Sequence, residues 1–234
     1  MTDRDGRYYR RVPGPIDHVF LDIGGVLYDD RVYAEAWRRA LREAGGEFSD
    51  ARFDEEYAVC RAGQDRSFRV HLATALLGAD ADIDALEARA GKYWQYPPSA
   101  LHADVVPTLT ELRGAGYRLG VIANQPSQVR VEMERDGLVG FFETWGVSDD
   151  LGLHKPDPLL FTRTLELAAV EPGRTVMVGD RLDYDMRPAA AAGMRTVWIL
   201  RGEAPDDPTP AQLAVPDAVI EELQQLPAVL EELS

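Results

Sequence analysis

Residues 18–27 read His-Val-Phe-Leu-Asp-Ile-Gly-Gly-Val-Leu, and this stretch decides the fold. Its first half is a short apolar run of the kind that forms a strand buried on both faces of a sheet. Asp22 follows directly, and two glycines after it allow a tight loop. In open α/β sheets, ligands bind beyond the carboxyl ends of the parallel strands. We therefore expect Asp22 to lie at the functional edge of an α/β protein.

Further apolar runs along the chain predict the other strands of this sheet. Each run is followed by a loop and then by apolar residues at helical spacing. Strands that alternate with helices indicate a parallel sheet covered on both faces. The predicted fold class is thus α/β, a Rossmann-like parallel sheet with helices on both faces. The predicted strands are His18–Ile23, Arg118–Ala123, Thr144–Val147, Thr175–Val178 and Thr196–Leu200.

The interval between the first and second predicted strands breaks this alternation. It contains several helical patterns and no convincing strand, which indicates a helical bundle inserted after the first strand. We therefore expect a Rossmann-like core formed by residues 1–28 and 104–234 and a helical cap formed by residues 29–103. Residues 216–234 are predicted to form a terminal pair of helices, with Pro227 in the first turn of the second. The predicted cap helices are 31–44, 51–62, 66–77 and 83–94.

The composition indicates an acidic globular protein. Hydrophobic residues make up 45% of the chain, and 40 acidic against 25 basic side chains give a formal net charge of −15. Such a surface repels nucleic acid and anionic membranes, so neither is an expected partner. The single cysteine, Cys60, excludes a disulfide within the chain. Residues 1–15 carry positive charge without the apolar run of a secretory signal, and no stretch has the length of a membrane span, so the expected location is cytoplasmic.

Polar residues collect at the predicted strand ends. Asn124 follows the second strand, Asp180 follows the fourth, and Asp185 comes five residues later. Lys155 and Pro156 stand before the helical pattern that leads into the fourth strand. Because the carboxyl ends of parallel strands share one edge, these side chains are expected to meet Asp22 there.

These four segments, in this order, resemble the signature segments of the haloacid dehalogenase-like hydrolases. The first normally reads Asp-x-Asp-Gly-Thr/Val-Leu and here is Asp22-Ile23-Gly24-Gly25-Val26-Leu27. The resemblance covers nearly the whole chain, and the inserted bundle is similar to the helical cap of one large branch of the family. It implies a hydrolase with an aspartate nucleophile, above all a magnesium-dependent phosphatase of a small phosphorylated metabolite that forms an aspartyl-phosphate.

The resemblance also implies a role for each residue. Asp22 is the nucleophile, and Lys155 supplies fixed positive charge to the phosphoryl oxygens. The expected Mg2+ ligands are Asp22, the carbonyl of Gly24, and Asp180, since magnesium prefers hard oxygen ligands. Asp185 is expected to orient Lys155 or a metal-bound water. The amides of Asn124 and of the loop at Gly25 are expected to bind the substrate phosphate.

Two positions depart from the family pattern. Gly24 stands where phosphatases of the family usually place a second Asp, which protonates the leaving alcohol and later activates water. Ala123 stands where a hydroxyl donor to the phosphate is usual, and Asn124 or Gln125 could replace that donor. Replacements considered for the missing acid are Asp29, Asp30, a cap residue and a metal-bound water. The loss also favours a substrate with a better leaving group, such as a sugar 1-phosphate or an acyl phosphate.

Other readings stay open beside the phosphatase. One is another hydrolase with an aspartate nucleophile, such as a 2-haloacid dehalogenase, which needs no metal. Another is a non-catalytic protein that binds a phosphorylated ligand. Cap residues would set the specificity, and the candidates to face the substrate are Arg61, Arg66, Arg69, His71, Lys92 and Trp94.

Overall fold

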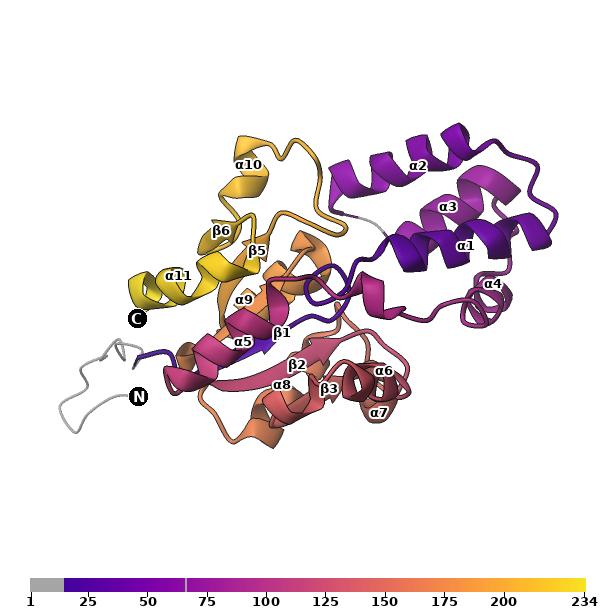
Figure 1. Ribbon diagram of the computed structural model, residues 1–234. Helices are drawn as coiled ribbons and strands as arrows, with labels where there is room; N and C mark the ends of the chain where they lie inside the picture. The colour runs from indigo at the N-terminus through magenta and orange to yellow at the C-terminus, as the bar shows by residue number, and fades with distance from the viewer. Residues whose placement is uncertain (1–14, 66) are drawn as a thin grey trace.

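A six-stranded parallel sheet forms the centre of the computed structural model, which describes residues 15–65 and 67–234 (Figure 1). The spatial order of the strands is β3-β2-β1-β4-β5-β6. This confirms the predicted α/β, Rossmann-like fold class. The strands are β1 His18–Leu21, β2 Arg118–Ala123, β3 Thr144–Val147, β4 Thr175–Gly179, β5 Arg195–Ile199 and β6 Ala218–Ile220.

The position of β1 within the sheet decides where a ligand can bind. Leu21 of β1 lies beside Val121 of β2 on one side and Val178 of β4 on the other. β2 and β3 lie on one side of β1, and β4, β5 and β6, which follow in sequence, lie on the other. Ligands of such sheets bind where the strand order reverses. The loops after β1 and β4 therefore flank the expected site.

Helices cover both faces of the sheet. Val19 and Leu21 of β1 point into a core that includes α5 and α11, whereas Phe20 points into a second core formed with α8 and α9. None of the helices in the described ranges is long and apolar enough to span a bilayer. The helices of this part are α5 Val105–Gly114, α6 Val129–Arg135, α7 Ser148–Leu151, α8 Pro158–Ala168, α9 Arg187–Ala191, α10 Pro210–Leu213 and α11 Leu226–Leu233.

Four of the helices between β1 and β2 stand together beside the sheet (Figure 1). They enclose a hydrophobic cluster of their own, centred on Trp37, Phe53 and Leu72. A helical bundle is therefore present where the sequence predicts a cap, while the boundaries at residues 29 and 103 stay predictions. The cap helices are α1 Arg31–Glu43, α2 Asp50–Gly63, α3 Phe68–Leu77 and α4 Ile83–Ala90.

The chain enters and leaves the cap along two paired segments. The amide of Asp29 donates to the carbonyl of Ala100 (2.8 Å), and the amide of His102 donates to the carbonyl of Leu27 (3.0 Å). The outgoing and returning linkers therefore run side by side, directly after the loop that carries Asp22.

The predicted pair of terminal helices is wrong in its first member. Ala218–Ile220 forms the edge strand β6 and pairs in parallel with β5. Asp217 explains this placement, because its carboxylate accepts hydrogen bonds from the amide (2.8 Å) and the hydroxyl (3.0 Å) of Thr196 and so ties the segment to β5. The second predicted helix is α11, with a proline in its first turn.

Candidate active site

Asp22 lies directly after β1, at the middle of the carboxyl edge of the sheet. Its backbone amide donates to the carbonyl of Val178 (2.9 Å), and its Oδ1 accepts from the amide of Ile23 (2.8 Å). Its Oδ2 lies 2.7 Å from the Nζ of Lys155. One carboxylate oxygen is therefore fixed by the loop, and the other faces a cation.

Lys155 is held between two carboxylates. Its Nζ is 2.7 Å from Asp22 Oδ2 and 2.7 Å from Asp185 Oδ1, and its side chain is only 3% exposed. The second oxygen of Asp185 accepts from the amide of Arg181 (3.0 Å). Burial lowers the pKa of Lys155, but Asp185 and Asp22 outweigh burial and raise it above its usual value. The lysine therefore stays positively charged, and Asp185 lies where it can orient that charge.

Asn124 holds the backbone of Lys155. Its Nδ2 donates to the carbonyl of Lys155 (3.0 Å), and its Oδ1 accepts from the Lys155 amide (2.7 Å). Gln125, the other residue considered as a donor to the substrate, gives its side-chain N–H to the hydroxyl of Tyr96 (3.1 Å). Both side-chain amides are thus engaged within the protein. A direct contact of Asn124 with the substrate stays a prediction, whereas its geometry supports a role in positioning Lys155.

The three predicted acids come together. Oxygens of Asp22, Asp180 and Asp185 lie within 4.8 Å of one another. Burial raises the pKa of Asp22 to about 7 against the opposing effect of Lys155, and burial followed by Asp185 and Asp22 raises the pKa of Asp180 well above its usual range. Buried carboxylates this close repel each other. A cluster of hard oxygen donors that is short of positive charge fits a divalent cation such as magnesium.

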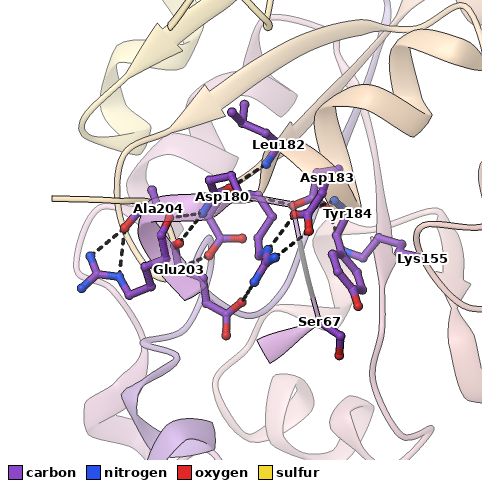
Figure 2. A network of polar contacts seen from close by, with 12 residues as sticks. Ser67, Lys155, Asp180, Leu182, Asp183, Tyr184, Glu203 and Ala204 are labelled. Carbon is purple, nitrogen blue, oxygen red and sulfur yellow. Dashed lines mark hydrogen bonds and ion pairs between the residues drawn. The ribbon is translucent and has the colours of Figure 1, made fainter. Parts of the chain in front are cut away.

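Asp180 is fixed by contacts on both its carboxylate and its backbone. Its Oδ2 accepts from the amide of Glu203 (2.6 Å), and its carbonyl accepts from the indole N–H of Trp198 (2.8 Å). Figure 2 shows Asp180 and Glu203 adjacent within the network that follows β4 and β5. The sequence alone indicated neither support.

Gly25 makes room for Asp180. A Cβ atom at residue 25 would lie 2.1 Å from Asp180 Oδ2, and the φ angle of +67° also favours glycine. The expectation that the Gly25 amide binds substrate meets a competing contact, because this amide donates to the carbonyl of Tyr28 (2.8 Å). The geometry supports close packing of the loop under Asp180, and binding of substrate by the Gly25 amide stays a prediction.

A cavity of about 460 Å³ lies over these groups. Asp22, Gly24, Asn124, Lys155 and Asp180 line it from the core. Of the cap side chains that face these groups, only Arg69 and Trp94 are among the candidates predicted from the sequence. The cap contributes Tyr33, Ser67, Phe68, Arg69, Glu87, Gly91 and Trp94.

The cap candidates from the sequence divide into two groups. Arg69 and Trp94 line the cavity, and Arg69 forms an ion pair with Glu87. Arg61 and His71 have other partners: Arg61 donates to the carbonyl of Ala204 (2.6 Å), and His71 Nε2 is 2.6 Å from Glu56 Oε2. Lys92 is not among the described lining residues, and Arg66 lies outside the described part of the chain.

Gln64 joins the cap to the core at the end of α2. Its side chain accepts from the amide of Leu182 (2.9 Å) and donates to the carbonyl of Glu203 (2.7 Å). Figure 2 labels both of these core residues. Its own carbonyl accepts from Arg187 (3.1 Å). We call Gln64 with these three core partners the clasp. A fully buried glutamine was not anticipated, because glutamine is usually exposed.

The family model for haloacid dehalogenase-like hydrolases matches residues 16–193. The chain belongs to this family. The acids at the ends of β1 and β4 and the lysine before α8 lie within this match, and their individual roles stay predictions.

Similar proteins in this family include named phosphatases. A glyceraldehyde 3-phosphate phosphatase of Methanopyrus kandleri is 33% identical over 231 residues, which covers 94% of this chain and 99% of that protein. A phosphoserine phosphatase of Thermus thermophilus is 31% identical and covers 81% of this chain and 76% of its own length. A crystal structure of a haloacid dehalogenase-family phosphatase from Thermococcus onnurineus is 27% identical, covers 92% of this chain and 98% of its own, and superposes with a TM-score of 0.60.

Proposed function

We propose that this hydrolase is a magnesium-dependent phosphatase of a small phosphorylated metabolite. The observation that carries the proposal is the placement of Asp22, whose Oδ2 lies 2.7 Å from Lys155 within a cluster of buried acids. The relatives named as phosphatases of glyceraldehyde 3-phosphate and of phosphoserine support this class of substrate. Because these two metabolites differ beyond the phosphate, the exact substrate depends on the cap side chains.

Each group has a distinct task in the proposed reaction. The carboxylate of Asp22 attacks phosphorus, the ester P–O bond breaks, and the phosphoryl group is transferred to Asp22. The ammonium of Lys155 stabilises the negative charge that develops on the phosphoryl oxygens. Asn124 fixes the backbone of Lys155 and Asp185 fixes its ammonium, so the charge is in place before the substrate arrives.

The acids also define the metal site of this proposal. Asp22, the carbonyl of Gly24, and Asp180 would hold the cation, and Asp185 stays with Lys155. A bound magnesium ion neutralises charge on the nucleophile and on the phosphate. Without such an ion, an acidic protein with this cluster would repel a phosphate dianion.

The test is phosphate release from a panel of substrates. The panel contains an aryl phosphate, acetyl phosphate, glyceraldehyde 3-phosphate, phosphoserine, and hexose 1- and 6-phosphates, each with magnesium and with chelator. We expect magnesium-dependent release that is lost in Asp22→Asn. The exposed acid Asp207 offers a control, since Asp207→Asn removes the same charge away from the cavity.

A 2-haloacid assay and a ligand-binding assay, run beside this panel, separate the other readings. Turnover of a 2-haloacid in chelator, with no phosphate release, would instead establish a dehalogenase. No turnover of any member, with retained binding of a phosphorylated ligand, would establish a non-catalytic protein. A cytoplasmic location stays a prediction, to be tested by fractionation of the cells that make the protein.

A further inference from the structure

The space beside Gly24 is filled by the carboxyl group of Asp30. A Cβ atom at residue 24 would lie 2.3 Å from Asp30 Oδ1 and 3.1 Å from Asp30 Cγ. The backbone of Gly24, in contrast to that of Gly25, does not have a positive φ angle. Conformation alone therefore does not require glycine at residue 24. A side chain at residue 24 would instead require the carboxyl group of Asp30 to move.

The carboxylate of Asp30 is not used to cap its own helix. Asp30 is the N-cap residue of α1, yet its side chain makes no capping hydrogen bond. The N-cap side chains of the other cap helices, Ser49, Ser67 and Asp82, all accept one. Such a bond is favourable for an aspartate at this position. Asp30 instead lines the cavity above Asp22.

Tyr96 supports this orientation from the returning linker. Its hydroxyl donates to Asp30 Oδ1 (3.4 Å) and accepts from Gln125 Nε2 (3.1 Å). Its ring is 1% exposed and stacks on Tyr28, with ring centroids 4.6 Å apart. Asp30 is thus contacted by a tyrosine of the linker, whose hydroxyl is in turn bonded by Gln125 after β2.

Cleavage of an alkyl phosphate requires a proton for the leaving oxygen, and a positioned carboxyl group can supply it. We propose that Asp30 is the acid–base residue of this hydrolase, acting from the space that a side chain at residue 24 would occupy. The inference rests on the proposed phosphatase function. It adds the group that moves the proton.

The two half-reactions balance through Asp30. As Asp22 attacks phosphorus and the ester P–O bond breaks, the Asp30 carboxyl gives its proton to the leaving alkoxide and releases an alcohol. The Asp30 carboxylate then takes a proton from water, whose oxygen attacks the phosphorus of the aspartyl-phosphate. The bond to Asp22 breaks, phosphate leaves, and both aspartates return to their starting forms.

This assignment also changes the expected class of substrate. A better leaving group was favoured only because Gly24 carries no acid. With Asp30 in that space, the site can cleave monoesters of ordinary primary alcohols. The enzyme is then no longer expected to prefer sugar 1-phosphates and acyl phosphates over hexose 6-phosphates or triose phosphates.

The test compares two esters in Asp30→Asn. With a primary alkyl phosphate we expect kcat to fall by about 10²–10⁴-fold, the usual contribution of such a group. With p-nitrophenyl phosphate, whose leaving group needs no proton, we expect one rapid equivalent of nitrophenolate and then slow turnover. Mass spectrometry should find the phosphate retained on Asp22. The control is Asp29→Asn, because Asp29 pairs with the exposed Arg31 and is absent from the described cavity lining.

A swap of the two positions tests the placement itself. Gly24→Asp alone should be impaired, because the two side chains collide. Gly24→Asp combined with Asp30→Ser returns a carboxyl to the vacated space and keeps a good N-cap residue. We expect at least tenfold faster alkyl phosphate turnover in this double variant than in Asp30→Ser. A folded double variant without that gain would contradict the placement.

The outcomes separate the inference from the proposed function. Equal activity of Asp30→Asn and the unsubstituted protein on the alkyl phosphate would overturn the inference alone. Loss of the rapid nitrophenolate release as well as of alkyl phosphate turnover, together with loss of magnesium-induced thermal stabilisation, would make Asp30 a metal ligand and also overturn it. No phosphate release by the unsubstituted protein would remove the proposed function and the inference with it.

Discussion

Lys155 illustrates how single side chains set the chemistry of this site. An ammonium that is 3% exposed requires compensation, and Asp22 and Asp185 both provide it at 2.7 Å. In the proposed reaction Asp22 becomes bonded to phosphorus, whereas Asp185 can keep its contact with Lys155 throughout. Asp185 thus keeps the ammonium of Lys155 in place while Asp22 reacts in the proposed mechanism.

Asp185→Asn should weaken both folding and catalysis. Removal of one member of a buried ion pair costs about 3–5 kcal/mol when the remaining charge is left unpaired. Because Asp22 still pairs with Lys155 and the repulsion among the three acids falls, we expect the free energy of unfolding in urea to fall by less than this. We also expect kcat to fall about 10–100-fold with a smaller change in KM, as for other residues that orient a catalytic group. Asp207→Asn is the control, and equal effects of the two variants would contradict this role.

Among the helices and strands, the end of α2 joins the cap to the core. The clasp places a polar side chain of the cap among backbone groups of the loops after β4 and β5. One of these loops carries Asp180, and Glu203 of the other donates its amide to Asp180. The cap and the proposed metal ligand Asp180 are therefore linked through a few hydrogen bonds, and Figure 2 shows Asp180, Leu182 and Glu203 in this network.

Gln64→Ala should loosen the cap. It leaves the amide of Leu182 and the carbonyl of Glu203 without this partner, and each buried unsatisfied group costs about 1–3 kcal/mol. We expect faster hydrogen exchange at Leu182, a lower melting temperature and faster proteolysis of the linkers.

The control for this prediction is Gln212→Glu. This change removes the donor to the carbonyl of Ala62, at the same end of α2, but keeps the acceptor that caps α10. We expect little change in this exposed contact. Unaltered exchange at Leu182 in Gln64→Ala would show that the clasp does not hold the cap.

For the whole molecule, charge is the dominant constraint. The net charge of −15 and the buried cluster of Asp22, Asp180 and Asp185 both oppose folding by repulsion among like charges. A cation bound only by the folded chain offsets part of this repulsion. Magnesium is therefore expected to affect stability as well as activity.

Magnesium should raise the melting temperature by mass action. At about a hundredfold excess over Kd the gain is about 2.7 kcal/mol, which corresponds to about 5–10 °C for a chain of this size. Sodium chloride at matched ionic strength separates specific binding from general screening. The shift should disappear in Asp180→Asn. Equal shifts with both salts would argue against a specific site.

The fold could be predicted largely because its strands are short apolar runs followed by helices. β2 and β3 have the predicted limits, and the other three predicted strands differ by one or two residues at their ends. β6 could not be predicted in the same way. It has three residues and lies at the edge of the sheet, and its position depends on Asp217 meeting Thr196 across the fold.

Some residues of the candidate site could likewise be predicted from the sequence, and others could not. Asp22, Lys155, Asp180 and Asp185 follow elements that are visible in the sequence, so their convergence could be predicted. Asp30 was only one of several replacements considered for the missing acid, because its approach to Gly24 depends on the path of the intervening loop. No local sequence pattern predicts the clasp, since the partners of Gln64 are backbone groups distant in sequence.

The indole of Trp198 gives this protein an optical reporter of its own. Trp198 is fully buried, and its N–H is bonded to the carbonyl of Asp180. Indole emission responds to the electric field and hydrogen bonding around the ring, so a cation that reaches the Asp180 carboxylate should shift or quench it. With Trp37, Trp94 and Trp145 changed to phenylalanine, fluorescence would follow occupancy of the acid cluster in real time, without a substrate and before any turnover.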